Sequence, residues 1–256
     1  MNKDTLRQFI NVLALAGVIV VNGLANTLPL NNLTTGEISD RFEVYFVPAG
    51  YVFSIWGLIY LALIAFAVYQ ALPAQRENPR LQRIGYLFAL SCAANVVWLF
   101  LWHYEVFPLT LVAMLALLVF LIAIYLRLNI GRAGVSPAEK WLVHVPFSIY
   151  LGWITVATIA NATSLLDYLE WGGWSISPET WAAIMLIAGA AIASAMGMTR
   201  GDVAYMLVII WAFVGIGVKH VGTPAVTTTT WAMTALVAIM LIVGALVQNR
   251  RSKAAQ

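Results

Sequence analysis

Aromatic and amide side chains recur at helical spacing in four apolar stretches of the chain, and they are the first candidates for chemistry. The four sets are Asn11, Asn22 and Asn26; Phe53, Trp56 and Tyr60; Asn95, Trp98 and Trp102; and Tyr150, Trp153, Ala157 and Asn161. Residues three or four positions apart lie on one face of a helix, so each set can face a common interior. Indole, phenol and amide groups around a void would form a flat, mostly apolar pocket that suits a planar or polycyclic ligand.

Each set also has a simpler explanation. Trp and Tyr are enriched at membrane–water interfaces, and Asn in a membrane helix often bonds only a neighbouring helix. The interfacial explanation suits Trp141, Trp171, Trp174 and Trp181. Trp56, Trp98 and Trp153 lie farther inside their stretches, which favours a pocket. The ligand-binding residues that we expect are Asn26, Phe53, Trp56, Tyr60, Asn95, Trp98, Trp102, Tyr150, Trp153, Ala157 and Asn161.

Other chemistry finds little support in the residue pattern. No Asp or Glu lies in the middle of an apolar stretch, and no pair of His or carboxylate residues has metal-ligand spacing there. His103, His144 and His220 lie near the ends of stretches, where an interfacial or hydrogen-bonded role is the simpler one. The single cysteine, Cys92, excludes an internal disulfide. There is no nucleophile–base pair and no glycine loop for a nucleotide, so we expect no metal and no required cofactor, and an enzyme is not the expected class.

The composition indicates which elements must position these residues. Of the 256 residues 62% are hydrophobic and only 10% are charged, and the mean hydropathy is +0.86, which excludes an ordinary soluble domain. A membrane-spanning helix needs about 20 mostly apolar residues. Eight stretches approach this length, at about 9–30, 50–72, 85–104, 107–126, 142–166, 180–198, 203–218 and 229–248. The sequence therefore predicts an all-α integral membrane protein, an eight-helix bundle whose first stretch is a retained helix rather than a signal peptide.

The charges predict the orientation of this bundle. With the N-terminus in the cytoplasm, 12 of the 14 basic residues fall on the cytoplasmic side, and only Arg41 and Lys219 lie outside. This agrees with the positive-inside rule, and an even number of helices places the C-terminus in the cytoplasm as well. The basic residues then need no nucleic-acid partner. The pattern fits a bacterial inner (cytoplasmic) membrane best.

Small residues and one long connection complete the pattern. Gly189, Ala193 and Gly197 repeat every four residues and permit close helix contact, either inside the chain or in a homodimer. The longest expected non-helical stretch is 31–49, which could act as a lid over the pocket.

Three segments resemble the translocator protein / tryptophan-rich sensory protein family. They are the segment 48–60, with Pro48, Trp56 and Tyr60; Asn95 and Trp98 in the third stretch; and Tyr150, Trp153, Ala157, Thr158 and Asn161 in the fifth. The resemblance covers about residues 9–166 and implies a five-helix membrane unit over 1–166. The chain departs from the family pattern after Trp98, where Ser-Pro is replaced by Leu99-Phe100. Residues 167–256 have no counterpart in the five-helix family and are expected to form a three-helix extension.

The resemblance also implies a function. The family binds porphyrins and other polycyclic ligands, so this chain is expected to be a membrane receptor or carrier for a tetrapyrrole such as a porphyrin or haem, with a sensory or regulatory role. Some members are reported to promote light-dependent porphyrin breakdown, which would involve Trp153. A transporter of another small neutral solute is the alternative, although the chain lacks an inverted repeat and midplane charges. The expected partners are the lipid bilayer and a small hydrophobic ligand.

Overall fold

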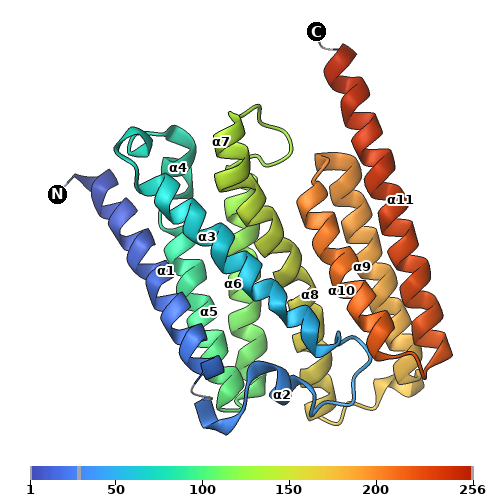
Figure 1. The fold of residues 1–256 in the computed structure, drawn as a ribbon. Helices are drawn as coiled ribbons and strands as arrows, with labels where there is room; N and C mark the ends of the chain where they lie inside the picture. Colours follow the sequence, from blue (N-terminus) through green and yellow to red (C-terminus); the bar gives the residue numbers. More distant parts are fainter. Residues whose placement is uncertain (1, 28–29, 255–256) are drawn as a thin grey trace.

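The computed structural model describes residues 2–27 and 30–254 and, for 26–27 and 249–254, the backbone alone. Helices are the only regular elements in these residues (Figure 1). The long helices are α1 (Lys3–Thr27), α3 (Ile55–Ala71), α5 (Leu87–His103), α6 (Phe107–Arg127), α8 (Val145–Tyr168), α9 (Pro178–Arg200), α10 (Val203–Lys219) and α11 (Pro224–Ala254). The short ones are α2 (Thr35–Ser39), α4 (Pro79–Ile84) and α7 (Pro137–Glu139), with a π-helical turn over Lys140–His144 and short 3-10 turns at Leu30–Asn32, Gly50–Ser54, Pro73–Gln75 and Gly173–Ser175.

Six segments are long and apolar enough to cross a membrane. They are Lys3–Ala25, Gly50–Ala71, Phe107–Arg127, Pro137–Tyr168, Pro178–Arg200 and Pro224–Gln248. The two shorter apolar helices, α5 and α10, have 17 residues each, which at about 1.5 Å per residue is close to the thickness of a hydrocarbon core. The prediction of an all-α membrane protein is thereby confirmed.

Two boundaries differ from the sequence prediction. The connection 31–49 was expected to be non-helical, and this is wrong for Thr35–Ser39, which forms α2. The helix begins there because Thr34 and Glu37 form a capping box: each side chain bonds the backbone N–H of the other residue. Helix α11 begins at Pro224 rather than near 229, because proline is well accommodated in the first turn of a helix.

The helices form two groups that contact each other mainly through α10 and α8. In Figure 1, α1, α3, α5, α6 and α8 lie together, and α9, α10 and α11 form a second group. Helix α10 packs directly on α8, where a Cβ at Gly152 would lie 3.1 Å from the carbonyl oxygen of Tyr205. The start of α1 and the end of α11 lie at the same end of the molecule, with α4 and α7, whereas α2 lies at the opposite end (Figure 1).

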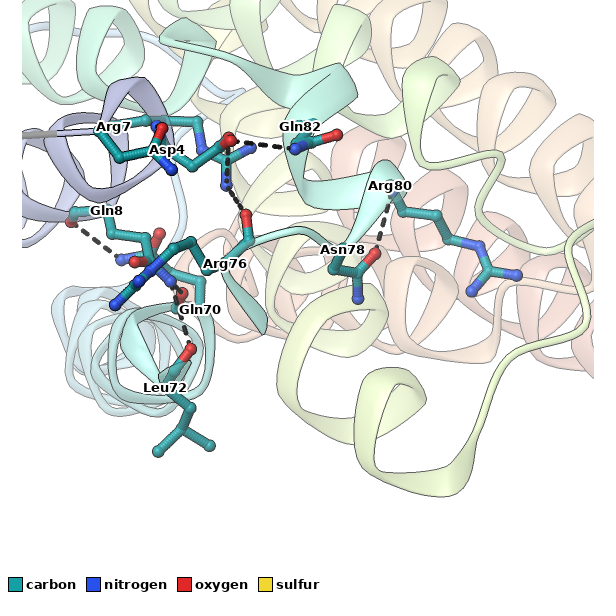
Figure 2. A network of polar contacts seen from close by, with 10 residues as sticks. Asp4, Arg7, Gln8, Gln70, Leu72, Arg76, Asn78, Arg80 and Gln82 are labelled. Atoms are coloured by element: carbon teal, nitrogen blue, oxygen red, sulfur yellow. Dashed lines mark hydrogen bonds and ion pairs between the residues drawn. The ribbon is translucent and has the colours of Figure 1, made fainter. Parts of the chain in front are cut away.

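The first helix is fastened to the rest of the bundle at both ends. Figure 2 shows the polar contacts of its N-terminal part: Gln8 donates to the Gln70 carbonyl at 2.6 Å, Gln70 donates back to the Gln8 carbonyl, and Arg7 donates to the Arg76 carbonyl at 2.9 Å. Farther along, Asn22 donates to the side chain of Asn95 on α5 at 3.0 Å. Helix α1 is therefore an integral part of the bundle.

The small-residue stripe on α9 packs within the chain. A Cβ on Gly189 would lie 3.1 Å from the ring of Phe213, and one on Gly197 would lie within 3 Å of Met206. Helix α11 also approaches α9 at this point, because a Cβ at Gly244 of α11 would lie only 2.9 Å from the Gly197 carbonyl oxygen. Of the two explanations for the stripe, intramolecular packing is the one that the structure contains.

Replacing Gly244 by leucine is expected to destabilise the protein, because the new side chain meets backbone that cannot move without separating α9 from α11. Overpacking of this kind costs about 1–3 kcal/mol. The measurement is the apparent melting temperature in detergent, which should fall by several degrees. Gly17→Leu is the matched control, because Gly17 lies in the middle of α1 and a Cβ added there would have no neighbouring atom within 4 Å. Equal melting of the two variants would contradict the proposed close contact.

Candidate functional site

The predicted aromatic residues converge on two adjoining cavities beneath α2. The larger has a volume of about 370 Å³, and its lining is Asn22, Thr34, Thr35, Gly36, Gly50, Phe53, Trp56, Tyr60, Trp98 and Leu99. The smaller, of about 40 Å³, is lined by Thr35, Ser39, Val47, Pro48, Phe53, Trp56, Trp98, Trp102, Trp153, Val156, Ala157, Ala160, Asn161 and Ser164. Because Thr35, Phe53, Trp56 and Trp98 line both, we treat the two as one site and call it the aromatic cavity. The larger volume lies at the low end of small-molecule pockets, which span about 300–1,000 Å³.

Rings from three helices form the wall of the aromatic cavity. On α3, Trp56 stacks on Tyr60 with ring centroids 5.5 Å apart, and on α5, Trp98 stacks in the same way on Trp102 at 5.7 Å. Trp153 of α8 meets the Trp56 ring edge-on at 6.2 Å. Stacked and edge-on pairs are the preferred geometries of aromatic rings, so the wall is held in shape by its own contacts.

The amide side chains connect the helices behind this wall. Asn95 accepts from Asn22 and donates to the Tyr150 hydroxyl at 3.2 Å, so neither Asn95 nor Tyr150 lines the cavity. The indole N–H of Trp98 donates to Asn161 at 3.1 Å, and Asn161 donates to Thr110 of α6 at 2.8 Å. These bonds fix the positions of α1, α5, α6 and α8 around the rings. Asn26 was also expected at the site, but its side chain lies outside the described residues.

Two buried donors of the aromatic cavity have no hydrogen-bond partner among the described residues. They are the indole N–H of Trp153, a residue that is only 2% exposed, and the hydroxyl of Tyr60. Both side chains line the cavity. A buried polar group without a partner costs about 1–3 kcal/mol. The site therefore combines flat apolar walls with two donors that a polar atom of a ligand would satisfy.

Helix α2 closes the cavity and is bonded to the end of α5. The Trp102 indole donates to the Thr35 carbonyl at 3.2 Å, and the Thr35 hydroxyl lies 3.1 Å from Nε2 of His103. The other ring nitrogen of His103 lies 3.0 Å from the Leu30 carbonyl. His103 is thus a fully buried histidine whose two ring nitrogens contact α2 and Leu30. We call the segment 30–49, which includes α2, the lid.

Two ion pairs fasten the part of the lid that follows α2. Arg41 pairs with Glu105 at 2.5 Å, and this hydrogen bond lowers the pKa of the Glu105 carboxyl, so the pair is present at neutral pH and is lost only in acid. Lys219, at the end of α10, pairs with Asp40 at 2.6 Å. Exposed pairs of this kind are typically worth about 0–1 kcal/mol each, so they permit the lid to open.

The second group of helices also contacts the lid. The N–H of Ala49 donates to the Gly215 carbonyl of α10 at 3.1 Å, and the Trp211 indole donates to the Val52 carbonyl at 3.1 Å. The Val52 side chain occupies the space that a Cβ at Gly215 would need. The segment that precedes α3 therefore lies between the aromatic cavity and α10, so the second group of helices braces one side of the lid.

Sequence reasoning missed a buried carboxylate at the opposite end of the molecule. Asp202, which is 6% exposed, follows the left-handed Gly201 that ends α9, and it caps α10 by accepting the N–H of Tyr205. It also accepts the hydroxyls of Tyr125 at 2.7 Å and Ser148 at 2.6 Å. An Asp directly before an apolar stretch is a signal for a helix N-cap, but the sequence did not indicate its two tertiary partners.

Comparison with known proteins identifies one matching family. A family model described as TSPO-like protein matches residues 8–243, which includes the second group of helices as well as the first. No curated protein and no solved structure matches the chain.

Proposed function

The chain belongs to the TSPO-like protein family, and on that premise we propose that it is a membrane protein that binds a planar hydrophobic ligand in the aromatic cavity. A tetrapyrrole such as a porphyrin is the ligand class that we favour, and the role that we propose is that of a receptor or carrier with a sensory or regulatory output. The ligand-binding residues in this proposal are those expected from the sequence, with Asn95 and Tyr150 acting from behind the wall.

One observation carries this proposal: two unpaired buried donors, on Trp153 and Tyr60, lie in a wall made of stacked aromatic rings. The rings offer flat apolar surface to a polycyclic ligand, and the donors can bond ring nitrogens or peripheral oxygens. A tetrapyrrole does not fit a volume of about 370 Å³ unless the cavity expands. Binding therefore requires α2 to move away from α5, which breaks the Trp102 to Thr35 bond.

The experiment is a fluorescence titration of the purified protein in detergent with protoporphyrin IX. We expect saturable quenching of tryptophan emission with a dissociation constant near or below about 1 µM, equivalent to about 8 kcal/mol of binding free energy. Purely linear quenching would contradict tetrapyrrole binding. In that case the alternative function, transport of another small neutral solute, would be tested by uptake into proteoliposomes with and without a gradient.

Light-dependent breakdown of the bound porphyrin is a further proposed activity, and it can be measured on the same protein–porphyrin complex. Illumination of the complex should bleach the porphyrin absorbance faster than illumination of free porphyrin if Trp153 takes part in the chemistry. Equal bleaching of the two samples would limit the role to binding.

We also propose that the chain crosses the membrane eight times, with both termini in the cytoplasm of a bacterium. Helices α5 and α10 complete the count, and 12 of the 14 basic residues then lie on the cytoplasmic side. In this arrangement residues 1–166 form a five-helix unit and 167–256 a three-helix extension, packed into one membrane domain.

Cysteine labelling tests the orientation. Cys92 is the single cysteine of the chain, so a Cys92→Ser background has no thiol and should be silent towards a membrane-impermeant maleimide. In intact cells we expect labelling of Gly172→Cys, which lies between α8 and α9, and none of Ser136→Cys, which precedes α7. After the membrane is opened both should react. The reverse pattern in intact cells would overturn the proposed orientation.

A further inference from the structure

A second and larger cavity lies between α3, α8 and α10, and nothing in the proposed function uses it. Its volume is about 1040 Å³, and the residues that line it differ from those of the aromatic cavity. It begins at the turn between α9 and α10, where Arg200, Gly201 and Asp202 line it, and it ends at Trp211. We call it the α8–α10 groove.

The groove has the length and the apolar lining that one lipid acyl chain requires. From Val203 to Trp211 the chain advances eight residues along α10, or about 12 Å, which is close to the thickness of one leaflet of a hydrocarbon core. Along this length the wall is apolar, with Ile55 and Leu58 from α3, Ile149 from α8 and Leu207 from α10. The groove is open at the side, so a hydrocarbon chain can lie in it lengthwise.

The end of the groove near the α9–α10 turn is basic. Arg200 and Lys140 both line it, and among the described residues no carboxylate lies within ion-pair distance of either. The guanidinium of Arg200 contacts uncharged groups in the described residues, namely the side chain of Asn129, the carbonyl of Ile130 and the ring of Tyr125. Two cations without a paired anion favour a ligand that carries negative charge.

A buried imidazole adds a second, independent indication of a ligand. His144 is only 6% exposed, and its Nε2 has no hydrogen-bond partner among the described residues. The side chain lines the groove at the end of the π-helical turn Lys140–His144, a geometry that is frequent at functional sites. An anionic ligand in the groove could offer one oxygen atom to Nε2 and others to the two cations that line the same end.

The one carboxylate in the groove is already engaged. Asp202 accepts two hydroxyls, from Tyr125 and Ser148, and one backbone N–H, from Tyr205. Three donors aimed at one carboxylate stabilise its charge locally and reduce its repulsion of a neighbouring anion. Basic clefts between membrane helices at the cytoplasmic side are known to receive anionic lipid head groups.

From these observations we propose that the α8–α10 groove binds an anionic phospholipid, with its phosphate between Arg200, Lys140 and His144 and one acyl chain along α10 towards Trp211. The site is separate from the aromatic cavity and does not depend on the proposed function of that cavity. A lipid in the groove would contact α3 and α8 of the first group of helices and α10 of the second.

The experiment counts lipids bound to the purified, detergent-solubilised protein by native mass spectrometry. Phosphatidylglycerol and phosphatidylcholine with identical acyl chains are added at equal concentrations. We expect one phosphatidylglycerol to bind at least about fivefold more tightly than phosphatidylcholine. The double variant Arg200→Gln/Lys140→Gln should lose most of this preference. Arg83→Gln/Arg127→Gln removes the same charge from exposed residues outside the groove and should retain the preference.

A third variant distinguishes binding in the groove from binding to surface charge alone. Ala204→Phe leaves both cations in place and fills the apolar part of the groove, so it should weaken binding about fivefold at an unchanged melting temperature. Equal binding of the two lipids, full binding by Ala204→Phe, or displacement of the lipid by millimolar inorganic phosphate would each overturn the proposal. The last outcome would identify a phosphate site in its place.

Discussion

Trp153→Phe is expected to weaken protoporphyrin binding about tenfold, and Trp153→Phe combined with Tyr60→Phe about a hundredfold. Each substitution removes one of the two unpaired buried donors and keeps an aromatic ring at the same position. A hydrogen bond to a ligand contributes about 0.5–1.5 kcal/mol, and a tenfold change in affinity corresponds to about 1.4 kcal/mol. The two donors lie on different helices and make no hydrogen bond to each other. Both rings contact Trp56, so the hundredfold loss is the value expected if the two effects add in full.

Trp174→Phe is the matched control for this series. Trp174 is 77% exposed and contacts Trp171 and Trp181, away from the aromatic cavity. Its variant loses one tryptophan from the emission signal in the same way but should bind porphyrin like the wild type. The proposed pocket would be abandoned if the double variant bound the porphyrin as tightly as Trp174→Phe. A loss of affinity in Tyr60→Phe alone would locate the ligand in the larger part of the cavity.

Asp202→Ala is expected to lower the apparent melting temperature by about 6–12 °C, the largest stability effect that we anticipate from a single substitution. It leaves the hydroxyls of Tyr125 and Ser148 without their acceptor and removes the N-cap of α10. Unpaired buried donors cost about 1–3 kcal/mol each, and a lost cap about 1 kcal/mol. Together these exceed about 3 kcal/mol, and each kilocalorie shifts the melting temperature by about 2–4 °C in a chain of this size.

The Asp202→Asn variant shows whether hydrogen bonding or charge is responsible. Its amide oxygen can still cap α10, and its NH₂ group can donate to hydroxyls that have turned, so we expect a much smaller loss. Asp167→Ala, at an exposed position near the end of α8, should melt like the wild type. If Asp202→Ala also melted like the wild type, the buried carboxylate would not be what holds α6, α8 and α10 together at this end.

The sequence by itself determined much of this protein. Continuous apolar stretches that lipid must cover can only be helices, because each backbone polar group has to be satisfied within the segment. The positions of the long helices follow from this constraint alone. Periodicity is equally local: residues three and four apart must share a helix face, and for this reason Trp56, Trp98 and Trp153 were placed on the faces that line the aromatic cavity. Helix α2 was missed, since 31–49 was expected to be non-helical, although the capping box at Thr34 and Glu37 is a local signal that could have indicated it.

Only the tertiary structure decided which partner each polar group has. An Asn in a membrane helix bonds either a ligand or a neighbouring helix. Spacing along the chain cannot distinguish the two, because the choice depends on residues that lie far away in the sequence. Asn95 and Asn161 bond their neighbours, whereas the donors of Trp153 and Tyr60 remain unpaired among the residues that the structure describes.

The same reason explains Asp202 and the α8–α10 groove. Asp202 lies in a two-residue turn that reads as exposed, and it is buried because α6 and α8 bring two hydroxyls to it. The groove lies between α3, α8 and α10, and the position of one helix relative to another is set by side-chain contacts that no single stretch of sequence contains.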